Sequence, residues 1–548
     1  MIKNFHFSDK ILYLLTFLLG FIVFTCIYGL EIVKPCNTEW LIGGDLEQHN
    51  IGWQAFRRDP WFFPLGMFNS LTYPYPVSII YTDSIPLVAS FFKMLSPILP
   101  EHFQYFGLWG LLCILLQSFL GAKILKRFCK NNSIVLIGSL FFTLSPVLFF
   151  RLFGHEALAG QWLILWAISE FIWRSEKPKT FLQNCVLWCI MGFLVIGIHL
   201  YFLPMVAIFL CGCVAWDILQ EKNYKSLLYP IIYCISAIVM ILIMGGFSHF
   251  GATFDDDGLT IFTFNLNGFV NPIGTSRFLH NLPYGQWQHE GFGYLGLGMI
   301  LFSLFSFIIV VHSLFKKKTQ PFQSRNRWYY IISMCLAAIF FILACSPRIT
   351  FGKGTIINYI NILPQKVVDF WSIFRSTGRF IWSVVYLIFI ANIFITNKFF
   401  SPKNSLIIIS LFVTIQIVDL SSYLNRRKET TFTTPNEYIT FNDGVMNKVG
   451  ESGSFKHLVF DSSTHFTSKE YYSFAEYALK YNLTMNYFWL VHNTGEIEPF
   501  TSVENDCIYI FDGRDSINHK TNPKLLYFNE GDYIIGISQE LNTFNNEL

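Results

Sequence analysis

Long apolar runs recur along the chain and constrain its fold more than any other feature of the sequence. About eleven of them approach or reach the length that a helix needs to cross the hydrocarbon core of a bilayer. They cover 11–30, 103–125, 133–150, 159–173, 185–199, 202–219, 228–247, 294–315, 329–345, 380–396 and 405–421. Only 14% of the 548 residues are charged and 53% are hydrophobic, whereas soluble domains carry about 25% charged residues. We therefore expect an α-helical polytopic membrane protein with about eleven transmembrane helices.

Lysine and arginine residues indicate the orientation of these spans. Every second connection is short and basic, as around Lys126, Lys177, Lys222 and Lys316. Cytoplasmic loops carry such an excess of positive charge, so we place the N-terminus and these connections inside. The long outer loops are then 31–102, 248–293 and 346–379. Residues 84–99 are apolar but contain Lys93 and two prolines, which favours a helix lying in the membrane interface over a further span.

The composition becomes polar after Tyr423. Short alternating runs such as 457–460 and 507–511 are bounded by Asn, Asp and Gly, a pattern typical of strands and turns. We predict a transmembrane domain over 1–423 and a small soluble α/β domain over 424–548. An odd number of spans places this tail on the extracytoplasmic side, while Arg426, Arg427 and Lys428 argue for the opposite side.

Charge and cysteine content exclude several classes of protein. A net charge of +3 provides no broad basic surface, so we expect no nucleic-acid partner. Most of the 12 cysteines lie inside apolar runs, where a thiol behaves as a small hydrophobic group. Cys211 and Cys213 lack the spacing and partners of a zinc site. We expect neither a metal nor another cofactor.

The first outer loop is dense in residues that could carry chemistry. It begins Gly43-Gly44-Asp45-Leu46-Glu47-Gln48-His49, and Arg57 and Arg58 follow. Transfer of a group to a hydroxyl needs a carboxylate that takes the proton and positive charge that stabilises a leaving phosphate. The alternative is that Asp45 caps a helix at the membrane border while the arginines meet lipid headgroups.

Four motifs of the chain resemble those of a bacterial family of polytopic membrane proteins that is itself similar to the type C (GT-C) glycosyltransferases. The motifs are Gly43-Gly44-Asp45-x-x-Gln48-His49-x-x-Gly52-Trp53, Tyr81-Thr82-Asp83-Ser84-Ile85-Pro86, Gly291-Phe292-Gly293-Tyr294-Leu295-Gly296 and Phe374-Arg375-Ser376-x-Gly378-Arg379-Phe380. The resemblance covers roughly 35–385 and implies a polyprenyl-phosphate sugar as donor. It also implies an acid of the first outer loop as catalytic base, at Asp45 with Glu47 as the neighbouring candidate, and arginines that bind the donor phosphate.

Further outer residues are candidates for binding the acceptor or the sugar. They are His49 and Asp83 in the first loop, His155 and Glu156 in the short turn between the third and fourth spans, and Trp287, His289 and Glu290 before the eighth span. Aromatic faces stack on sugar rings, and carboxylates accept hydrogen bonds from hydroxyls. The alternatives are a helix-capping pair at 155–156 and an interfacial anchor at Trp287. His199 is more typical of a structural histidine.

Arginines near the tenth span are the predicted site for the donor phosphate. Arg375 and Arg379 are four residues apart, on one face if the segment is helical, and Arg348 is a further candidate. A guanidinium group matches phosphate oxygens with two hydrogen bonds. Snorkelling towards lipid headgroups is the alternative for either arginine alone. The run Asp255-Asp256-Asp257 could bind a divalent cation but is more typical of a solvated turn.

These patterns together predict a membrane glycosyltransferase that moves a sugar from a polyprenyl-phosphate donor to an extracytoplasmic glycan acceptor. We expect it in the bacterial cytoplasmic (inner) membrane as a multi-pass protein in contact with membrane lipid, with its active site facing outward. A glycan polymerase or ligase is one alternative, because it would share this topology. A transporter of polysaccharide or lipid-linked sugar is another, although ionisable residues here gather at span ends and not at mid-span.

Overall fold

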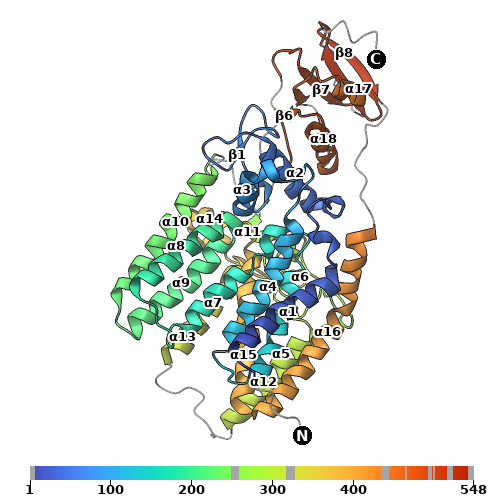
Figure 1. Ribbon diagram of the computed structural model, residues 1–548. Coiled ribbons are helices and arrows are strands. Elements are labelled where there is room, and N and C mark those ends of the chain that lie inside the picture. The colour runs from blue at the N-terminus through green and yellow to red at the C-terminus, as the bar shows by residue number, and fades with distance from the viewer. Residues whose placement is uncertain are drawn as a thin grey trace. The chain divides into compact units, whose positions relative to one another are not determined.

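The chain forms two compact units in its computed structural model (Figure 1). Unit 1 comprises 1–37, 105–238 and 254–434, and unit 2 comprises 38–104, 239–253 and 435–548. The structure describes 7–248, 258–315, 327–433, 444–462, 464, 466–490, 497, 500–514 and 522–540, with 430–433 as backbone alone. The acidic run 255–257 lies outside the described residues.

Ten helical segments of the described ranges are long and apolar enough to cross a membrane. They are α1 (Asp9–Tyr28), α4 (Phe106–Leu125), α5 (Asn132–Thr143) with α6 (Pro146–Phe149), α8 (Phe181–Ile198), α9 (Phe202–Leu219), α10 (Leu228–Met244), α12 (Leu297–Phe315), α13 (Arg327–Cys345), α15 (Ile381–Phe399) and α16 (Pro402–Thr433). By length and composition the chain is therefore a multi-pass membrane protein, as predicted.

The predicted fourth span, 159–173, differs from this set. Its helix α7 (Trp162–Trp173) has 12 residues, because the 3-10 turn η5 (Glu156–Ala159) ends at the first residue of the predicted run and the helix begins only at Trp162. Twelve helical residues extend about 18 Å, against about 30 Å for the hydrocarbon core. Most of α7 is buried inside unit 1. Such an irregular backbone is tolerated at membrane depth only where protein surrounds it.

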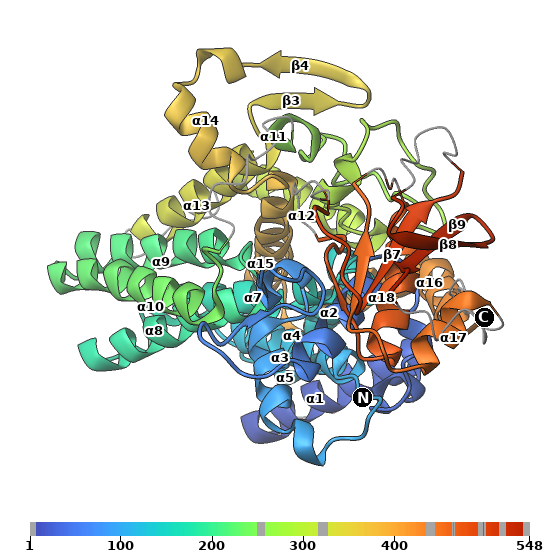
Figure 2. The same cartoon turned by 90° about the horizontal axis from the view of Figure 1, so that it is seen from above.

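Small residues bring the helices of unit 1 close together. A Cβ atom at Gly121 of α4 would lie 2.7 Å from the Phe142 ring of α5, and one at Gly192 of α8 would lie 2.0 Å from Ser236 Oγ of α10. Close approach of this kind drives helix association where lipid surrounds the helices and water exclusion contributes little. In both Figure 1 and Figure 2, α8, α9 and α10 run alongside one another.

The last helix, α16, extends 12 residues beyond the predicted end of its span at 421. Its Arg427 donates hydrogen bonds to the carbonyl oxygens of Leu152 and Phe153, at 3.3 and 3.2 Å, in the turn that follows α6. Arg426 donates to the Gly274 carbonyl at 2.5 Å. These two arginines satisfy backbone acceptors within unit 1, which gives them a structural role apart from any role in topology.

Three shorter elements of unit 1 surround the candidate site. η7 (Gln288–Gly291) precedes α12, η10 (Thr377–Phe380) precedes α15, and the single-turn helix α11 (Gly258–Ile261) lies in the second long loop. The third long loop forms a hairpin of β3 (Arg348–Phe351) and β4 (Gly354–Asn358), followed by the helix α14 (Gln365–Ser372).

Unit 2 joins the first long loop to the tail. The loop contributes α2 (Gly44–Arg58), the strands β1 (Met67–Phe68) and β2 (Val77–Ser78), η3 (Ile79–Thr82) and α3 (Pro86–Met94). α3 has nine residues, too few for a span. The tail contributes α17 (Val445–Glu451), β5 (His457–Phe460), α18 (Ser468–Lys480), β6 (Thr484–Met485), β7 (Cys507–Asp512), β8 (Leu525–Glu530) and β9 (Tyr533–Ser538).

The tail folds as an α/β sheet in the order β6-β5-β7-β9-β8. β5 is parallel to β6 and β7, whereas β9 is antiparallel to β7 and β8. The predicted strands at 457–460 and 507–511 are confirmed as β5 and β7. Backbone hydrogen bonds link loop and tail, because Met485 N donates to the Ser70 carbonyl at 2.7 Å and Tyr73 N donates to the Met485 carbonyl at 2.6 Å.

Candidate active site

A buried cluster of three charged side chains connects three separate segments of unit 1. Glu290 of η7 accepts hydrogen bonds from Arg379 of η10 at 2.7 and 2.9 Å, and from Arg151 at 2.9 and 3.3 Å. Arg151 also donates to the Glu290 carbonyl at 3.0 Å. The side chains of Arg151 and Arg379 are 6% and 9% exposed. We call Arg151, Glu290 and Arg379 the ion cluster.

The charges of the ion cluster determine its protonation. Burial alone would raise the pKa of Glu290, but the attraction of Arg151 and Arg379 outweighs it and holds that pKa well below its usual range. Glu290 is therefore ionised, and two guanidinium groups surround one carboxylate. Removal of any one member would leave a charge of this cluster without its counter-ion, which is costly in a buried setting.

A row of aromatic and imidazole rings leads away from the ion cluster. The Arg379 guanidinium lies 4.4 Å from the centre of the Tyr201 ring, and the Tyr201 hydroxyl accepts a hydrogen bond from Ser376 N at 2.7 Å. The His199 ring follows at 5.4 Å from Tyr201, and the His155 ring at 5.7 Å from His199. Two histidines singled out from the sequence are thus close to each other in unit 1.

Glu156 is the residue next to His155, and its side chain is fully buried. Burial raises the pKa of this carboxyl to about 8, against smaller opposing effects of the Phe153 backbone and Arg427. The group is therefore mostly protonated at neutral pH. A buried acid in this form can donate a proton or a hydrogen bond, whereas an ionised one can only accept.

Exposed groups lie beside the ion cluster. Trp287 is 51% exposed and adopts a left-handed backbone conformation at φ 61°. Its ring centre lies 5.7 Å from the ring of His289 and 6.4 Å from the ring of Phe262. The Arg375 guanidinium packs 4.8 Å from the centre of that same Phe262 ring. An accessible aromatic face, an imidazole and a guanidinium thus share one region of unit 1.

Arg375 and Arg379 do not share a helical face. α14 ends at Ser372, and the backbone at Ser376 (φ −92°, ψ 62°) is not helical, so the condition for that face is not met. Arg379 is buried in the ion cluster while Arg375 is half-buried. Arg348 begins β3, where it donates to Thr355 Oγ1 at 3.1 Å, and no contact with the ion cluster is seen among the described residues.

The acids of the first loop lie at the start of α2 in unit 2. Asp45 is exposed, whereas Glu47 is 4% exposed and accepts a hydrogen bond from Gly43 N at 2.8 Å. Gly43 and Gly44 both have positive φ, which glycine adopts without strain, and the chain can therefore turn sharply into the helix. Burial raises the pKa of Glu47 to about 7, partly offset by the Gly43 hydrogen bond.

The two other predicted residues of the first loop lie near this helix. His49 is fully buried, and burial lowers its pKa to about 3, so the ring is neutral. Its carbonyl oxygen accepts a hydrogen bond from Ser84 Oγ at 2.7 Å. Asp83, 9% exposed, has a left-handed backbone at the end of η3. A Cβ atom at Gly52 would lie 2.4 Å from Thr82, which explains the glycine in this motif.

The tail packs against the helix that carries these acids. Gln48 Nε2 donates to the Trp489 carbonyl at 3.2 Å, and Arg58 donates to the carbonyls of Leu483 and Ala478 at 2.6 and 3.2 Å. Tyr472 of α18 is buried nearby, and its pKa is raised by burial and by the charges of Asp45 and Glu47. The tail thus supplies a phenol beside the proposed catalytic acid.

Sequence reasoning did not select three residues that matter to this geometry, Arg151, Tyr201 and Tyr472. Arg151 had a detectable signal, because a cation directly after an apolar run must find a partner or reach water. Tyr201 is one of 26 tyrosines and shows no distinguishing pattern. Tyr472 lies in the tail, for which the sequence predicted no contact with the first loop.

Comparisons with known proteins give matches of different weight. No curated protein matches the chain. Among solved structures, the apo crystal structure of the Archaeoglobus fulgidus oligosaccharyltransferase is similar at 10% identity, with a TM-score of 0.42. That match covers 88% of this chain and 65% of the other, so this chain spans less than two thirds of the archaeal enzyme. A family model described as "Domain of unknown function (DUF6311)" covers residues 17–421. Because it spans more than half of the 548 residues, the chain belongs to that family.

Proposed function

We propose that this protein is a membrane glycosyltransferase that uses a lipid-linked sugar, with a polyprenyl phosphate as carrier, as its donor. The paired guanidinium groups of the ion cluster, which lie beside the exposed Trp287 and the half-buried Arg375, are the observation that carries the proposal. Positive charge held beside an exposed aromatic face suits a ligand that combines a phosphate with a sugar ring. Trp287 and His289 would contact the sugar, and Arg375 would bind the phosphate.

The arginines have different roles in this proposal. Arg379 is already bound to Glu290, so it would contribute through the electrostatic potential of the ion cluster. Arg375 is half-buried and stacked on Phe262, so its guanidinium can turn towards an incoming anion. Arg348, in the exposed hairpin, would serve the same phosphate only after the hairpin moves. Arg375 is therefore the arginine we assign to direct contact.

The acid of the first loop would act as the general base. An acceptor hydroxyl oxygen attacks the anomeric carbon, its proton passes to the Asp45 carboxylate, and the bond from that carbon to the phosphate oxygen breaks. The phosphate leaves with the bonding electron pair, and the arginine charge stabilises it. Glu47 is occupied by the Gly43 hydrogen bond and would position the start of α2. His49, Asp83, His155 and Glu156 remain proposed contacts of the acceptor.

Two features favour transfer over transport. The perturbed acids Glu47, Glu156 and Glu290 lie outside the ten long helices. The two buried acids of the described residues within those helices have structural partners, because Asp217 binds Arg174 and Asp419 accepts hydrogen bonds from Tyr294 and Leu297 N, whereas a conduit needs ionisable groups that remain available. The ion cluster joins loops that precede α12 and α15, at helix ends. A polymerase that joins preassembled chains would share these features, and its products would distinguish it because they grow by whole repeats and not by single sugars.

The test is a transfer assay with the full chain purified in lipid, a labelled polyprenyl-phosphate sugar and candidate glycan acceptors. Asp45→Asn should lower the transfer rate about 10² to 10⁴-fold, the usual contribution of a general base. The matched control is Glu39→Gln, which removes an exposed acid of the same unit and should leave the rate unchanged. Transfer by Asp45→Asn at the wild-type rate would remove Asp45 from the mechanism.

The phosphate role has its own measurement. Arg375→Ala should weaken donor binding about tenfold while acceptor binding stays constant, because a hydrogen-bonded charge contact contributes about 1.5 kcal/mol or more. Donor affinity equal to that of the wild-type protein would contradict the assignment of Arg375.

A further inference from the structure

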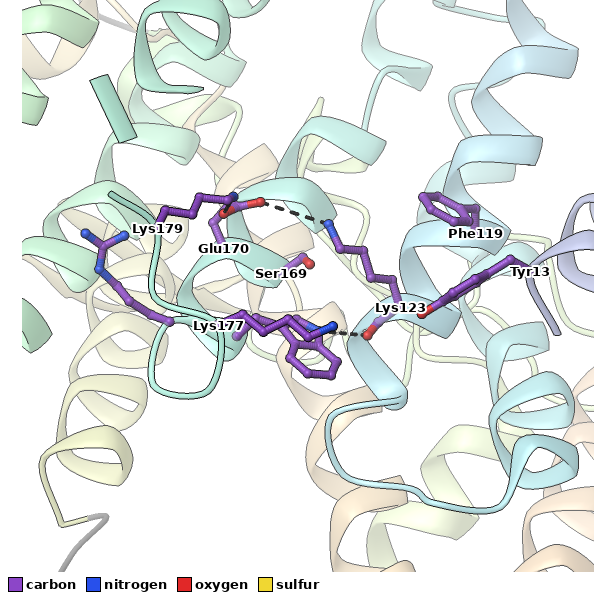
Figure 3. Close-up of a pocket in the computed structure, with 9 residues that line it drawn as sticks. Tyr13, Phe119, Lys123, Ser169, Glu170, Lys177 and Lys179 are labelled. Carbon is purple, nitrogen blue, oxygen red and sulfur yellow. Dashed lines mark hydrogen bonds and ion pairs between the residues drawn. The ribbon is translucent and has the colours of Figure 1, made fainter. Parts of the chain in front are cut away.

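A second cluster of cations lines a pocket of about 210 Å³ in unit 1, at the ends of α4 and α7 (Figure 3). Lys123 reaches it from the last turn of α4, and Lys177 and Lys179 reach it from the connection between α7 and α8. Tyr13 of α1, Phe119 of α4 and Trp173 of α7 form its aromatic walls. None of these residues belongs to the ion cluster or to the proposed transfer site.

The pocket carries more positive than negative charge. Four cations line it, the three lysines and Arg174, against one carboxylate, Glu170. Arg174 is neutralised by Asp217, to which it donates hydrogen bonds of 2.5 and 2.6 Å. Glu170 binds Lys179 and lies 4.0 Å from Lys123. Among the residues that line the pocket, three lysines therefore share one carboxylate. Asp9, outside the lining, also attracts Lys177 but forms its ion pair with Lys126.

Two further groups point to an anion as the ligand. Ser169 Oγ is buried in the wall, with no hydrogen-bond partner among the residues that the structure describes. The Lys177 ammonium lies 4.4 Å from the centre of the Trp173 ring, a cation–π contact that leaves its positive charge in place at the pocket. A hydroxyl donor and an ammonium group together match the oxygens of a phosphate.

The aromatic side of the pocket distinguishes it from a solvated basic loop. The rings of Tyr13 and Phe119 pack edge to face at 5.3 Å between two candidate spans, and both are half-buried. A basic connection that serves only to orient a span needs neither a cavity nor an aromatic wall. The volume is below the about 300–1,000 Å³ of pockets for drug-sized ligands, which suits a headgroup-sized anion.

We propose that this pocket binds a phosphate-bearing anion. The lysines would bind the phosphate of an anionic lipid headgroup, and the aromatic walls would contact its apolar part, whose chains would continue along α1 and α4. The same lysines would bind free phosphate. The proposal does not depend on the proposed transfer reaction, because the pocket shares no residue with it.

The test measures binding to the full chain in a neutral detergent by native mass spectrometry, with three probes. They are a short-chain phosphatidylglycerol, the zwitterionic phosphatidylcholine of the same chain length, and inorganic phosphate. Lys177→Gln should weaken binding of the anionic probe about fivefold, and Lys123→Gln combined with Lys177→Gln roughly 25-fold. The matched control is Lys225→Gln, an exposed lysine of the next connection that does not line the pocket.

The outcomes separate the sources of the phosphate. Binding of phosphatidylglycerol alone supports a lipid-borne phosphate, and binding of inorganic phosphate with equal loss in Lys177→Gln supports a free one. Equal weakening by Lys225→Gln would show diffuse surface charge and overturn the proposal, as would absence of binding by every probe. Circular dichroism of each variant establishes that it is folded, and Ser169→Ala, which keeps all charges, should weaken binding by a smaller factor than Lys177→Gln.

Discussion

Two buried glutamates of unit 1 differ in protonation because they differ in partners. Glu290 lies between Arg151 and Arg379, which hold its pKa well below the usual range. Glu156 is more deeply buried and forms no ion pair among the described residues, so burial raises its pKa to about 8. The same side chain is thus an anion in one place and a neutral acid in the other. Burial alone does not determine whether a glutamate is ionised. The presence or absence of neighbouring cations decides it.

Removal of the charge at Glu290 should have the largest effect. Glu290→Gln leaves two buried guanidinium groups around a neutral amide, which should lower the free energy of unfolding by about 3 to 5 kcal/mol. Glu156→Gln is the matched variant, because it replaces an acid that is already neutral in the folded state, and at pH 5 it should change the free energy of unfolding by about 1 kcal/mol or less. Chemical denaturation in detergent at pH 5 measures both. Equal losses of unfolding free energy in the two variants would contradict the conclusion that Glu290 is ionised and Glu156 is neutral.

The pH dependence of stability should have opposite signs at the two acids. The folded-state pKa of Glu156 is above its unfolded value, so its contribution is fully present below about pH 4.5 and is lost as the pH rises towards 8. Between pH 5 and 8 the loss should be about 3 kcal/mol, and Glu156→Gln should abolish it. Glu290 has a depressed pKa, so its contribution is lost only as the pH falls below about 4.5. If the stability of the wild-type protein and of Glu156→Gln changed with pH in the same way, the predicted contribution of Glu156 would be disproved.

Glu47 of unit 2 tests whether burial without a neighbouring cation also raises the pKa of a glutamate outside unit 1. Its pKa of about 7 is also raised by burial, so its contribution is lost as the pH rises from about 4.5 to 7. Glu47→Gln should remove about 2 kcal/mol of that dependence while its amide oxygen still accepts the Gly43 hydrogen bond. The midpoint of thermal unfolding, measured between about pH 4.5 and 7, gives this dependence. If the stability of Glu47→Gln depended on pH as strongly as that of the wild-type protein, Glu47 would be ionised over this whole pH range.

The smallest effect is expected at Arg375. Its charge is half-buried and stacked on one ring, so Arg375→Ala should lower the free energy of unfolding by about 0.5 to 1 kcal/mol. Arg379→Ala should cost several times more, because it removes one of the two partners of Glu290. Denaturation of the two variants side by side separates an arginine that builds the site from one that remains available to a ligand. Similar losses would remove that distinction.

The span pattern was predictable because each membrane helix needs about 20 apolar residues, a signal that is local in the sequence. α7 deviates because its helix begins at Trp162, three residues into the predicted apolar run, after η5 has ended at Ala159. The contacts of the site depend on pairing between distant segments. Arg151 and Glu290 are 139 residues apart, and no local pattern indicates that they meet. Glu290 was selected from the sequence as a sugar ligand, which stays a prediction, but its residue type gave no sign that two arginines would surround it.

The contact between Gln48 and Trp489 spans 441 residues of the chain. A ribosome that adds about 5 to 20 residues each second needs between roughly 20 and 90 seconds to synthesise that interval. The segment with Asp45 therefore emerges early but must wait for the last part of the protein before its unit is complete. Until then, Asp45 lacks the tail residues that pack around α2. A partly synthesised protein would therefore have its apolar helices before unit 2 could fold.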